Sequence, residues 1–443
     1  MAQRVLVIGA GKSGAASGEF LARHGEQVII TAEKREEKVE WLRELGVEFI
    51  WEQQPDLAEV KPDYLVVSPG VPLSIPPLVQ AQEMGIPVLG ELELAYRYAH
   101  APFLAITGTN GKTTTTTLVG ELMKTVKEDV FVGGNIGIPL ISAVEDLSAE
   151  SVIVAEVSSF QLETTTSFCP HIALMLNLTP DHLDRHGDMA GYLAAKARIF
   201  AAQGAEDYLV LNYDDTALRN LAPNAKAKVI FFSQKNKLEE GVYLENGMIC
   251  LTYNGETWEI CAAEELKIKG AHNLENAMGA TAVAFAAGVP REKIAAVLRS
   301  FAGVEHRMEP VRTVRGVQYV NDSKGTNPDA TMKALVAYQQ PIIVILGGKN
   351  KGSDFTELAG VVKQQTKAAV LLGQAKEELK EALDKVGFTA YTVVQTFEEA
   401  VATAAAQAQE GDLVLLSPAC ASWDMFKSFE ERGDLFKSLV QNL

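Results

Sequence analysis

The stretch Ile106-Thr-Gly-Thr-Asn-Gly-Lys-Thr-Thr114 decides the fold of this chain of 443 residues. It comes directly after a short apolar run and opens a segment with helical spacing. Glycines let successive backbone N–H groups converge on phosphate oxygens, while the start of a helix adds positive potential. Lys112 can neutralise the outer phosphates, and the Thr113 hydroxyl can ligate magnesium. The strict GxxxxGK[ST] pattern needs glycine where Ile106 stands, so we predict a shortened phosphate loop, the alternative being a plain turn between strand and helix.

The same alternation of strand and helix continues on both sides of this loop. The apolar runs that we interpret as strands are residues 4–9, 27–31, 64–68, 103–107, 151–159, 317–321, 341–348, 368–373 and 412–418. Alternating units of this kind form parallel sheets, and about 150 residues per domain gives about three domains. We therefore predict an α/β fold with a Rossmann-like domain over residues 1–93, a central P-loop-type ATPase domain over 94–298 and a second Rossmann-like domain over 299–443.

Three segments have a different pattern. Between about residues 207 and 262, short strands surround Asn246-Gly247 and Asn254-Gly255, which are strong hairpin signals, and we predict a small antiparallel flank there. A helical segment is expected from His272 to Ser300, and the alanine-rich stretch 400–408 is expected to be a helix.

The composition argues against several classes of function. A formal charge of −17 disfavours a nucleic-acid-binding surface or a polybasic membrane anchor. No apolar run approaches the ~20 residues of a membrane span, and the four cysteines show no CxxC spacing. We expect a cytoplasmic protein that binds neither nucleic acid nor membrane.

A second glycine motif, Gly9-Ala-Gly-Lys-Ser-Gly14, follows the first apolar run. Glu33 lies about 20 residues further on, as a dinucleotide-binding fold requires. Taken alone the motif indicates NAD, but the same turn serves any diphosphate and many plain strand–helix junctions. Because the phosphate loop lies in another domain, we interpret this motif as the site for the diphosphate of a nucleotide-linked substrate.

Ionisable side chains follow the strands next to the phosphate loop. Glu156 stands at a strand end, His182 lies in the polar run 181–186, and Lys196 lies on the helix after it. Because the carboxyl ends of parallel strands meet at one edge, Glu156 and His182 are candidate ligands of magnesium bound to ATP. The alternatives are a solvated glutamate, a hydrogen-bonded core histidine and an exposed lysine.

Polar runs also follow the strands of the last domain. Residues 305–307, 321–326 and 347–351 contain arginine and lysine that can bind a triphosphate or the carboxylates of an acidic amino acid, ordinary surface charge being the alternative. Residues 417–426 resemble another strand-to-helix turn. In it we expect Cys420 to be a packed side chain rather than a nucleophile.

Together these motifs resemble the Mur ligases of bacterial cell-wall synthesis, nearly from end to end of the chain. The segments that carry the resemblance are ITGTNGKTT (106–114), AEVSSFQLE (155–163), LNLTPDHLDRH (176–186), HNLEN (272–276), HRME (306–309), NDSKGTNPDA (321–330) and SPACASWDMFKSFEERG (417–433). The glycine-rich first domain and the last of these segments resemble the members that add D-glutamate. The DNPR signature expected of a tripeptide-forming member is absent from the sequence.

The resemblance implies a ligase that uses ATP and two Mg²⁺ ions to phosphorylate the terminal carboxylate of UDP-N-acetylmuramoyl-L-alanine. The amine of D-glutamate then attacks the acyl phosphate through a tetrahedral intermediate, and phosphate leaves. The first domain would bind the UDP-linked substrate, and the last would bind D-glutamate and close on ATP. We also expect a monomer.

The resemblance assigns roles to particular residues. The catalytic residues are Lys112, Glu156, His182 and Lys196. The metal ligands are Thr113, Glu156, His182 and Lys196, the last as a carbamate formed with CO₂. The ATP contacts are Gly108, Thr109, Asn110, Gly111, Lys112, Thr113, Thr114, Asn273, Asn276, Arg307 and Asp322. The contacts to the UDP-linked substrate are Gly11, Lys12, Ser13, Ser68, Asn135 and His182. The contacts to D-glutamate are Lys324, Thr326, Lys351, Ser422 and Phe429.

One segment departs from the family pattern. Residues 31–34 (TAEK), at the end of the second strand, do not reproduce the Asp-Thr-Arg type of uridine contact, and Lys12 and Lys34 are the candidates to replace it.

Three other classes of enzyme or module stay open. Folylpolyglutamate synthetase shares the chemistry but lacks a first domain of this kind. An NAD-dependent dehydrogenase or redox sensor would leave the phosphate loop without a purpose, and a P-loop module would hydrolyse ATP without transferring anything. Phosphate release that depends on both proposed substrates would separate all three.

Overall fold

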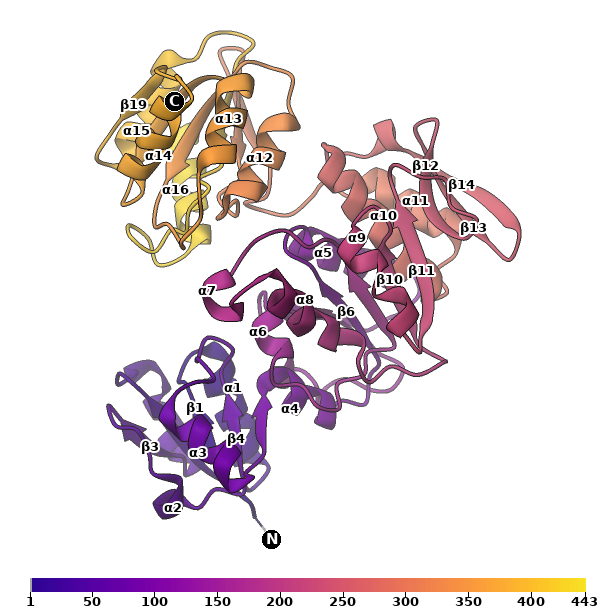
Figure 1. The fold of residues 1–443 in the computed structure, drawn as a ribbon, viewed down its shortest axis with the longest axis vertical. Helices are drawn as coiled ribbons and strands as arrows, with labels where there is room; N and C mark the ends of the chain where they lie inside the picture. Colours follow the sequence, from indigo (N-terminus) through magenta and orange to yellow (C-terminus); the bar gives the residue numbers. More distant parts are fainter. Residues whose placement is uncertain (1) are drawn as a thin grey trace. The chain divides into compact units, whose positions relative to one another are not determined.

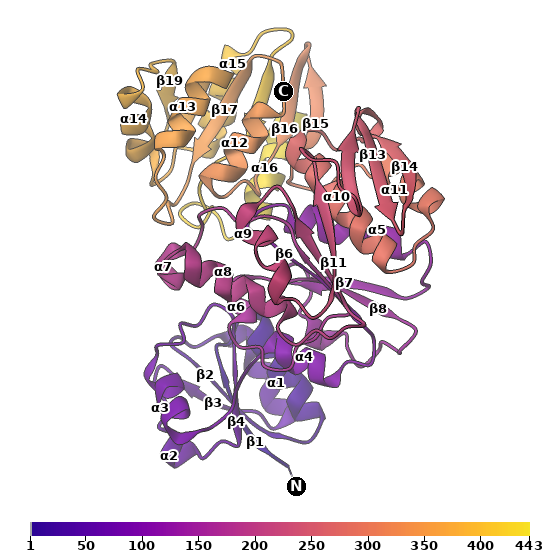
Figure 2. The same ribbon diagram turned by 45° about the vertical axis from the view of Figure 1, so that its right-hand side comes forward.

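The computed structural model describes residues 2–443, which form three β-sheets with helices packed against them (Figures 1 and 2). By compactness the chain divides into two units. The first unit comprises the chain up to residue 178 and residues 185–260 and 277–297. The second unit comprises residues 179–184, 261–276 and 298–443.

The first sheet has five strands in the order β3-β2-β1-β4-β5, and all four pairs are parallel. Its strands are β1 (Arg4–Ile8), β2 (Gln27–Ala32), β3 (Glu48–Trp51), β4 (Tyr64–Val67) and β5 (Val88–Gly90). Its helices are α1 (Lys12–Arg23), η1 (Glu37–Leu45), α2 (Leu57–Val60), α3 (Pro76–Met84) and α4 (Glu91–Tyr98). Alternate residues of a strand face opposite sides of the sheet. Val5 and Val7 therefore share a cluster with residues of α1, while Leu6 and Ile8 share one with residues of α2 and α3.

The second sheet has nine strands in the order β14-β13-β12-β11-β10-β9-β6-β8-β7. They are β6 (Phe103–Thr107), β7 (Val130–Gly134), β8 (Val152–Glu156), β9 (Ile172–Met175), β10 (Tyr208–Asn212), β11 (Lys228–Ser233), β12 (Gly241–Glu245), β13 (Met248–Tyr253) and β14 (Glu256–Ala262). The pairs from β7 to β12 are parallel. In this register Ile106 lies opposite Glu156, and Thr107 lies opposite Met175. The carboxyl ends of β6, β8 and β9 therefore meet at one edge.

The predicted antiparallel flank over residues 207–262 is confirmed for its hairpin and wrong for its first half. β12 and β13 are antiparallel around Asn246 and Gly247, whose φ angles of 51° and 79° are typical of a tight two-residue hairpin turn. β10 and β11, however, run parallel to each other and extend the central sheet. The short crossover between them contains α9 (Thr216–Arg219) and η4 (Ala222–Asn224). These helices are too short for a helical pattern of apolar residues to be recognised in the sequence.

Most helices of the central region connect strands of the second sheet, and the last three follow β14. In chain order the helices are α5 (Lys112–Met123), η2 (Leu140–Ser142), α6 (Ser159–Leu162), α7 (Leu183–His186), α8 (Met189–Ala197), η3 (Arg198–Phe200), η5 (Ala263–Glu265), α10 (Ala271–Ala286) and α11 (Arg291–Ser300). The helical segment expected from His272 to Ser300 is thus two helices. Gly288, in the left-handed region at φ +77°, ends the first one, and Pro290 precedes the second.

The third sheet has six strands in the order β15-β16-β20-β17-β18-β19. They are β15 (Glu309–Val314), β16 (Val317–Asn321), β17 (Ile342–Gly347), β18 (Thr366–Leu372), β19 (Tyr391–Val393) and β20 (Leu413–Leu416). The pair of β15 and β16 is antiparallel, and the other pairs are parallel. Two hydrophobic clusters cover the faces of this sheet. The helices that supply them are α12 (Pro328–Val336), α13 (Thr356–Gln365), α14 (Lys376–Lys385), α15 (Phe397–Gln407) and α16 (Phe429–Gln441).

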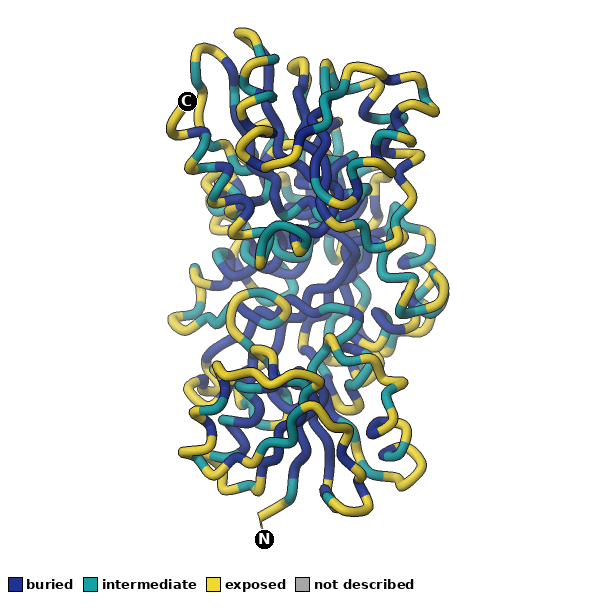
Figure 3. The backbone as a smooth tube through the Cα atoms, turned by 90° about the vertical axis from the view of Figure 1, so that its left-hand side faces the viewer, coloured by how far each residue is buried: buried dark blue, intermediate teal, exposed yellow. Residues whose placement is uncertain are grey.

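Burial follows this architecture. In Figure 3 the dark blue buried residues lie mainly in the strands and the inner sides of the helices, while the yellow exposed residues lie mainly in turns. Within residues 2–443 no helix combines the length and apolar character needed to cross a bilayer.

Candidate functional site

The phosphate loop connects β6 to α5, as predicted. Gly111 is the N-cap of α5 and has a left-handed backbone, with φ +83°. Gly108 also has positive φ, and a Cβ atom there would lie 3.0 Å from the Cβ atom of Leu176. Both glycines are therefore required by the shape of the loop.

Asn177, which follows β9, fixes the conformation of this loop. Its backbone carbonyl accepts a hydrogen bond from the Thr109 N–H at 3.0 Å. Its side-chain Oδ1 accepts from the Asn110 N–H at 2.9 Å, and its Nδ2 donates to the Asn110 carbonyl at 3.1 Å. We did not single out Asn177 from the sequence, although its position beyond a strand adjacent to β6 is a signal that could have identified it.

Two lysines converge on a single carbonyl of the loop. The Nζ of Lys112 donates to the Gly108 carbonyl at 2.9 Å and to the Thr109 carbonyl at 2.8 Å. The Nζ of Lys196 donates to the same Gly108 carbonyl at 2.8 Å and lies 4.6 Å from the centre of the Tyr192 ring. Lys196 is only 1% exposed, so the alternative of an exposed lysine is wrong. Lysines from α5 and α8 thus meet at the backbone of the phosphate loop.

Glu156 ends β8 with a buried carboxylate, so the alternative of a solvated glutamate is also wrong. Its Oε2 accepts a hydrogen bond from Thr113 Oγ1 at 2.8 Å, and its Oε1 accepts from Asn135 Nδ2 at 2.9 Å. The Asn135 N–H also donates to the Glu156 carbonyl at 2.9 Å. The structure thus brings the predicted residues Thr113, Glu156 and Asn135 together. Thr114, which we also predicted, lies buried on α5.

The oxygen atoms of Thr113 and Glu156 fit a magnesium ion that is completed by a nucleotide. Within residues 2–443, there is no group of three or more His, Cys, Asp or Glu side chains that could hold a metal ion by itself. Mg²⁺ is usually bound by one or two carboxylates together with substrate phosphates and water. A hydroxyl and a carboxylate beside a phosphate loop match that mode of binding.

The second glycine motif lies at the end of β1, next to Ser68. A Cβ atom on Gly14 would lie 1.8 Å from the Gly9 carbonyl oxygen, so the chain can make this close approach only with glycine. Ser68 Oγ donates to the same carbonyl at 3.2 Å. Gly11 is the N-cap of α1, and Lys12 and Ser13 form the first turn of that helix. The candidate contacts to the UDP-linked substrate on the first sheet, Gly11 to Ser13 and Ser68, therefore lie next to one another.

His182 lies in the second unit and has a left-handed backbone, with φ +53°. Its Nε2 lies 3.6 Å from Oδ2 of Asp181, and its side chain is 35% exposed, so it is not a core histidine. Asp181 also accepts a hydrogen bond from Asn327 Nδ2 at 3.3 Å and lies 3.8 Å from the Nζ of Lys351.

Asp322 is a buried carboxyl group at the end of β16. Oδ2 accepts a hydrogen bond from Ser417 Oγ at 2.7 Å, and Oδ1 lies 3.8 Å from Nη1 of Arg307. Burial raises the pKa of Asp322, while the nearby Arg307 charge and the hydrogen bonds oppose that rise. The structure thus pairs two residues that we assigned to ATP.

The asparagines assigned to ATP lie on α10. Asn276 Nδ2 donates to Asn273 Oδ1 at 3.1 Å, and both side chains are buried. Burial, together with the charges of Arg307 and Lys333, lowers the pKa of the preceding His272 to about 3. Its imidazole is therefore neutral at physiological pH.

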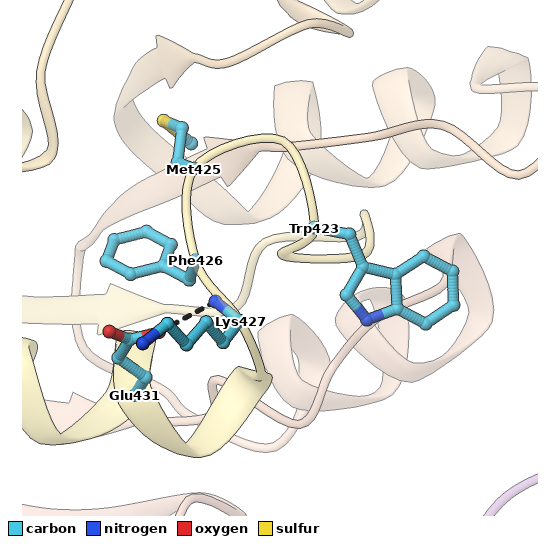
Figure 4. Close-up of a pocket in the computed structure, with 5 residues that line it drawn as sticks. All are labelled: Trp423, Met425, Phe426, Lys427 and Glu431. Atoms are coloured by element: carbon cyan, nitrogen blue, oxygen red, sulfur yellow. Dashed lines mark hydrogen bonds between the residues drawn. The ribbon is translucent and has the colours of Figure 1, made fainter. Parts of the chain in front are cut away.

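The residues assigned to D-glutamate lie in loops of the second unit and, for Phe429, at the start of α16. The Nζ of Lys324 is 5.1 Å from the centre of the Phe429 ring, and the Thr326 N–H donates to the Lys324 carbonyl. Ser422 is buried, and the segment after it forms an open pocket of about 500 Å³ (Figure 4). The pocket is lined by Trp423, Met425, Phe426, Lys427 and Glu431.

Arg432 was missed by the sequence reasoning. It is 1% exposed, and it donates to Ser323 Oγ at 3.0 Å, to the Ser323 carbonyl at 2.7 Å and to the Cys420 carbonyl at 3.2 Å. It thereby joins two loops that carry predicted site residues. Burial lowers the pKa of Arg432 to about 10, so it stays charged at neutral pH. Cys420 is 1% exposed, which confirms that it is a packed side chain, and this burial raises the pKa of its thiol to about 12.

A phosphate loop with buried lysine and glutamate partners, in a chain of three α/β sheets, defines a nucleotide-dependent enzyme. Three family profiles match the chain: the Mur ligase MurD-like N-terminal domain over residues 3–90, the Mur ligase middle domain over 106–284 and the Mur ligase glutamate ligase domain over 306–420. The chain belongs to the Mur ligase family.

Curated relatives match over the full length. The UDP-N-acetylmuramoylalanine–D-glutamate ligase of Pelotomaculum thermopropionicum is 52% identical, covering 100% of this chain and 98% of its own. Ligases of the same name from Desulfitobacterium hafniense (99% and 97% covered) and Clostridioides difficile (100% and 99%) are 47% and 45% identical.

Solved structures of lower identity share the fold. The UDP-N-acetylmuramate–alanine ligase of Thermotoga maritima is 19% identical with a TM-score of 0.62, covering 99% of each chain. A MurF ligase of Thermotoga maritima in complex with ADP is 16% identical with a TM-score of 0.61, covering 94% of this chain and 96% of its own.

Proposed function

We propose that this chain joins D-glutamate to UDP-N-acetylmuramoyl-L-alanine and converts ATP to ADP and phosphate, in the synthesis of the peptidoglycan precursor. The observation that carries this proposal is the 52% identity, over the whole chain, to a ligase of that name. The phosphate loop, with two lysines on one carbonyl and a buried glutamate, supplies the matching chemistry.

The proposed reaction has two steps. The terminal carboxylate of the UDP-linked substrate attacks the γ-phosphorus of ATP, and ADP leaves, so that an acyl phosphate forms. The amine of D-glutamate then attacks the acyl carbon, loses a proton, and displaces phosphate through a tetrahedral intermediate. Phosphorylation is needed because oxide is a poor leaving group and phosphate a good one.

The residues of the loop act mainly by holding charge in place. Backbone N–H groups from Gly111 into the first turn of α5 would hold the β- and γ-phosphates, and Lys112 would neutralise charge as the γ-phosphoryl group transfers. Magnesium bound by Thr113 and Glu156 would supply Lewis-acid stabilisation of that group. We assign Lys196 as a carbamate able to bind a second magnesium, and His182 as a further metal ligand.

The other roles are proposals of the same kind. Adenine would contact Asn273 and Asn276, while ribose and phosphate would contact Arg307 and Asp322. The UDP-linked substrate would lie on Gly11, Lys12, Ser13, Ser68, Asn135 and His182. D-Glutamate would lie on Lys324, Thr326, Lys351, Ser422 and Phe429.

We propose three functional domains, at residues 1–93, 94–298 and 299–443. The first boundary falls within α4, which leads from the first sheet to the second. We further propose a monomer that works in the cytoplasm, where ATP and UDP-linked precursors are made. Neither a nucleic acid nor a membrane is needed by this reaction.

Phosphate release tests the proposal directly. The purified protein is given ATP, Mg²⁺ and UDP-N-acetylmuramoyl-L-alanine with each amino acid of a panel, which includes D-glutamate, L-glutamate and L-alanine. We expect release only with D-glutamate, together with a product heavier by one glutamate residue in mass spectrometry. Release without any amino acid, or with a different one, would reject the assigned substrate.

A further inference from the structure

Arg185 makes contacts on two sides of its guanidinium group. On one side Nε and Nη2 donate to the Glu163 carboxylate, at 3.0 Å and 2.6 Å to Oε2. On the other side Nη1 donates to the Pro69 carbonyl at 3.1 Å, and Nη2 donates to the Val71 carbonyl at 3.2 Å. The group also lies over the Phe160 ring, 4.3 Å from its centre. All these residues belong to the first unit.

The carbonyls that Arg185 holds belong to the turn after β4, residues 68–71. Within this turn the Val71 N–H donates to the Ser68 carbonyl at 3.0 Å, and the Ser68 N–H donates to the Ile8 carbonyl at 2.9 Å. Ser68 Oγ reaches the Gly9 carbonyl, which Gly14 also approaches closely. The turn therefore packs directly on the glycine motif at the end of β1.

The other partner of Arg185 connects to the buried Glu156. Glu163 is the C-cap of α6, a single helical turn whose N-cap Ser158 lies two residues after Glu156. His186 supports the same glutamate, with Nδ1 3.3 Å from its Oε1, and its Nε2 lies 3.0 Å from Ser159 Oγ. His186, the neighbour of Arg185, thus contacts both ends of the α6 turn, at Ser159 and at Glu163.

The contact set requires an arginine. Guanidinium carries five N–H donors in a rigid plane, so it can bind a carboxylate and two carbonyls at the same time. A lysine has a single ammonium centre and can reach only part of this set. The side chains of Arg185 and Glu163 are each 16% exposed, so water does not readily replace these bonds.

We propose that Arg185 is a positioning residue for the UDP-linked substrate. By tying the turn 68–71 to α6, it fixes the glycine-motif site relative to Glu156 and the phosphate loop. The diphosphate and the reacting carboxylate lie at opposite ends of the substrate. The glycine motif and the phosphate loop must therefore stay at a fixed separation to bind both. This inference rests on the proposed function, because that function supplies the substrate.

Steady-state kinetics of the full chain test this role, with three variants. Arg185→Ala removes all the contacts, and Arg185→Lys keeps part of them. Arg97→Ala is the matched control, since Arg97 likewise donates to a glutamate and a second residue, Glu93 at 3.0 Å and Thr166 at 3.1 Å, but does not contact the turn 68–71. Amide hydrogen exchange over residues 68–75, measured without substrate, provides a readout that does not depend on turnover.

We expect Arg185→Ala to raise the KM for UDP-N-acetylmuramoyl-L-alanine about tenfold, with the KM for ATP and for D-glutamate changed less than about twofold. Arg185→Lys should recover part of this loss, and Arg97→Ala should leave all three KM values unchanged. Exchange over residues 68–75 should quicken in Arg185→Ala and not in Arg97→Ala.

An unchanged KM for the UDP-linked substrate, or an equal rise in all three KM values, would overturn the positioning role. Wild-type protein that makes no product with D-glutamate would reject the proposed function instead. In that case the exchange measurement decides whether Arg185 holds the turn, and unchanged protection over 68–75 would overturn the inference by itself.

Discussion

At the scale of single residues, the two lysines at the phosphate loop differ in exposure. Lys112 is half-buried in the first turn of α5, while Lys196 comes from α8 and is enclosed. Burying an ammonium group is costly unless it is paired or hydrogen-bonded, and Lys196 meets this requirement with the Gly108 carbonyl and the Tyr192 ring. Removal of either lysine should therefore affect activity, but only removal of Lys196 should strongly affect folding.

Replacing Lys112 by alanine should lower kcat by at least about 100-fold, because the charge on the transferring phosphoryl group loses its neutralising partner. The melting temperature should change little. Phosphate release and thermal unfolding measure the two effects. Lys124→Ala is the control, since Lys124 follows the same helix and pairs with the exposed Glu121. A comparable loss there would mean that helix stability, and not phosphate binding, is responsible.

Replacing Lys196 by alanine should abolish turnover and lower stability, because the change removes a proposed metal ligand and leaves a cavity. If the carbamate proposal is correct, short carboxylic acids added to the assay should restore part of the activity by occupying the space of the lost side chain. The same acids given to Lys112→Ala should restore nothing. Rescue of both variants, or of neither, would count against a carbamate at Lys196.

Replacing Asn177 by alanine should raise the KM for ATP about 30-fold, because two hydrogen bonds that shape the loop at Asn110 are lost, at about 1 kcal/mol each. Initial-rate measurements at varied ATP concentration test this expectation. Asn220→Ala, at the C-cap of α9, is the control. An unchanged KM in Asn177→Ala would show that the loop keeps its shape without these bonds.

At the scale of elements, α4 carries two buried glutamates with opposite behaviour. Burial raises the pKa of Glu91 to about 7, against hydrogen bonds from the Ile141 and Leu140 N–H groups. Burial also opposes ionisation of Glu93, but hydrogen bonds from Ser167, Thr166 and Arg97 lower the pKa of Glu93 to about 2. One helix therefore combines a group that titrates near neutral pH with one that stays charged.

The pH dependence of stability should reveal this difference. A carboxyl whose pKa rises from 4.5 to about 7 on folding contributes stability below pH 4.5, and that contribution is lost as the pH rises to about 7. The shift corresponds to roughly 3 kcal/mol. Glu91→Gln should remove this loss, so that the free energy of unfolding of the variant falls less than that of the wild type between pH 5 and pH 8.

Denaturant titrations at several pH values measure this slope, and Glu93→Gln is the matched control. Because the pKa of Glu93 is lowered to about 2, its contribution is lost only as the pH falls towards that value. Its replacement should destabilise the protein by the same amount at pH 5 and pH 8. Parallel curves for wild type and Glu91→Gln would contradict the neutral buried carboxyl.

At the scale of the whole molecule, an acidic chain has to bind several anionic ligands. The formal charge of −17 repels nucleotides at long range, so affinity depends on local groups such as the loop N–H groups and Lys112. Both glycine motifs offer such groups, but they predict different ligands: the loop before α5 predicts ATP or ADP, and the motif before α1 taken alone indicates NAD.

Thermal unfolding distinguishes these ligands. ADP with Mg²⁺ at about 100 times its Kd should stabilise the protein by ~2.7 kcal/mol and raise the melting temperature by a few degrees. The same concentration of NAD should have no effect, and Lys112→Ala should lose most of the response to ADP. A shift with NAD comparable to that with ADP would revive the dinucleotide-binding alternative.

The local motifs of the site and most of the parallel strands could be predicted from the sequence. Glycine spacing, apolar runs and turn residues act over a few neighbours, so the phosphate loop, the hairpin at Asn246 and Gly247 and the strands β1, β6 and β17 were all recognisable. The strands β3, β5 and β19 were not recognised, since three or four residues at the side of a sheet carry too little pattern.

By itself, then, the sequence determined the chemistry: a phosphate loop, a family of motifs and the acidic and basic residues that accompany them. Only the tertiary structure decided which of these residues meet. Asn177 reaches Asn110 across 67 positions, Arg185 reaches Pro69 across 116, and Arg432 reaches Ser323 across 109. The physical reason is that the order of the strands, which sets these contacts, arises from the packing of distant segments and cannot be derived from local periodicity.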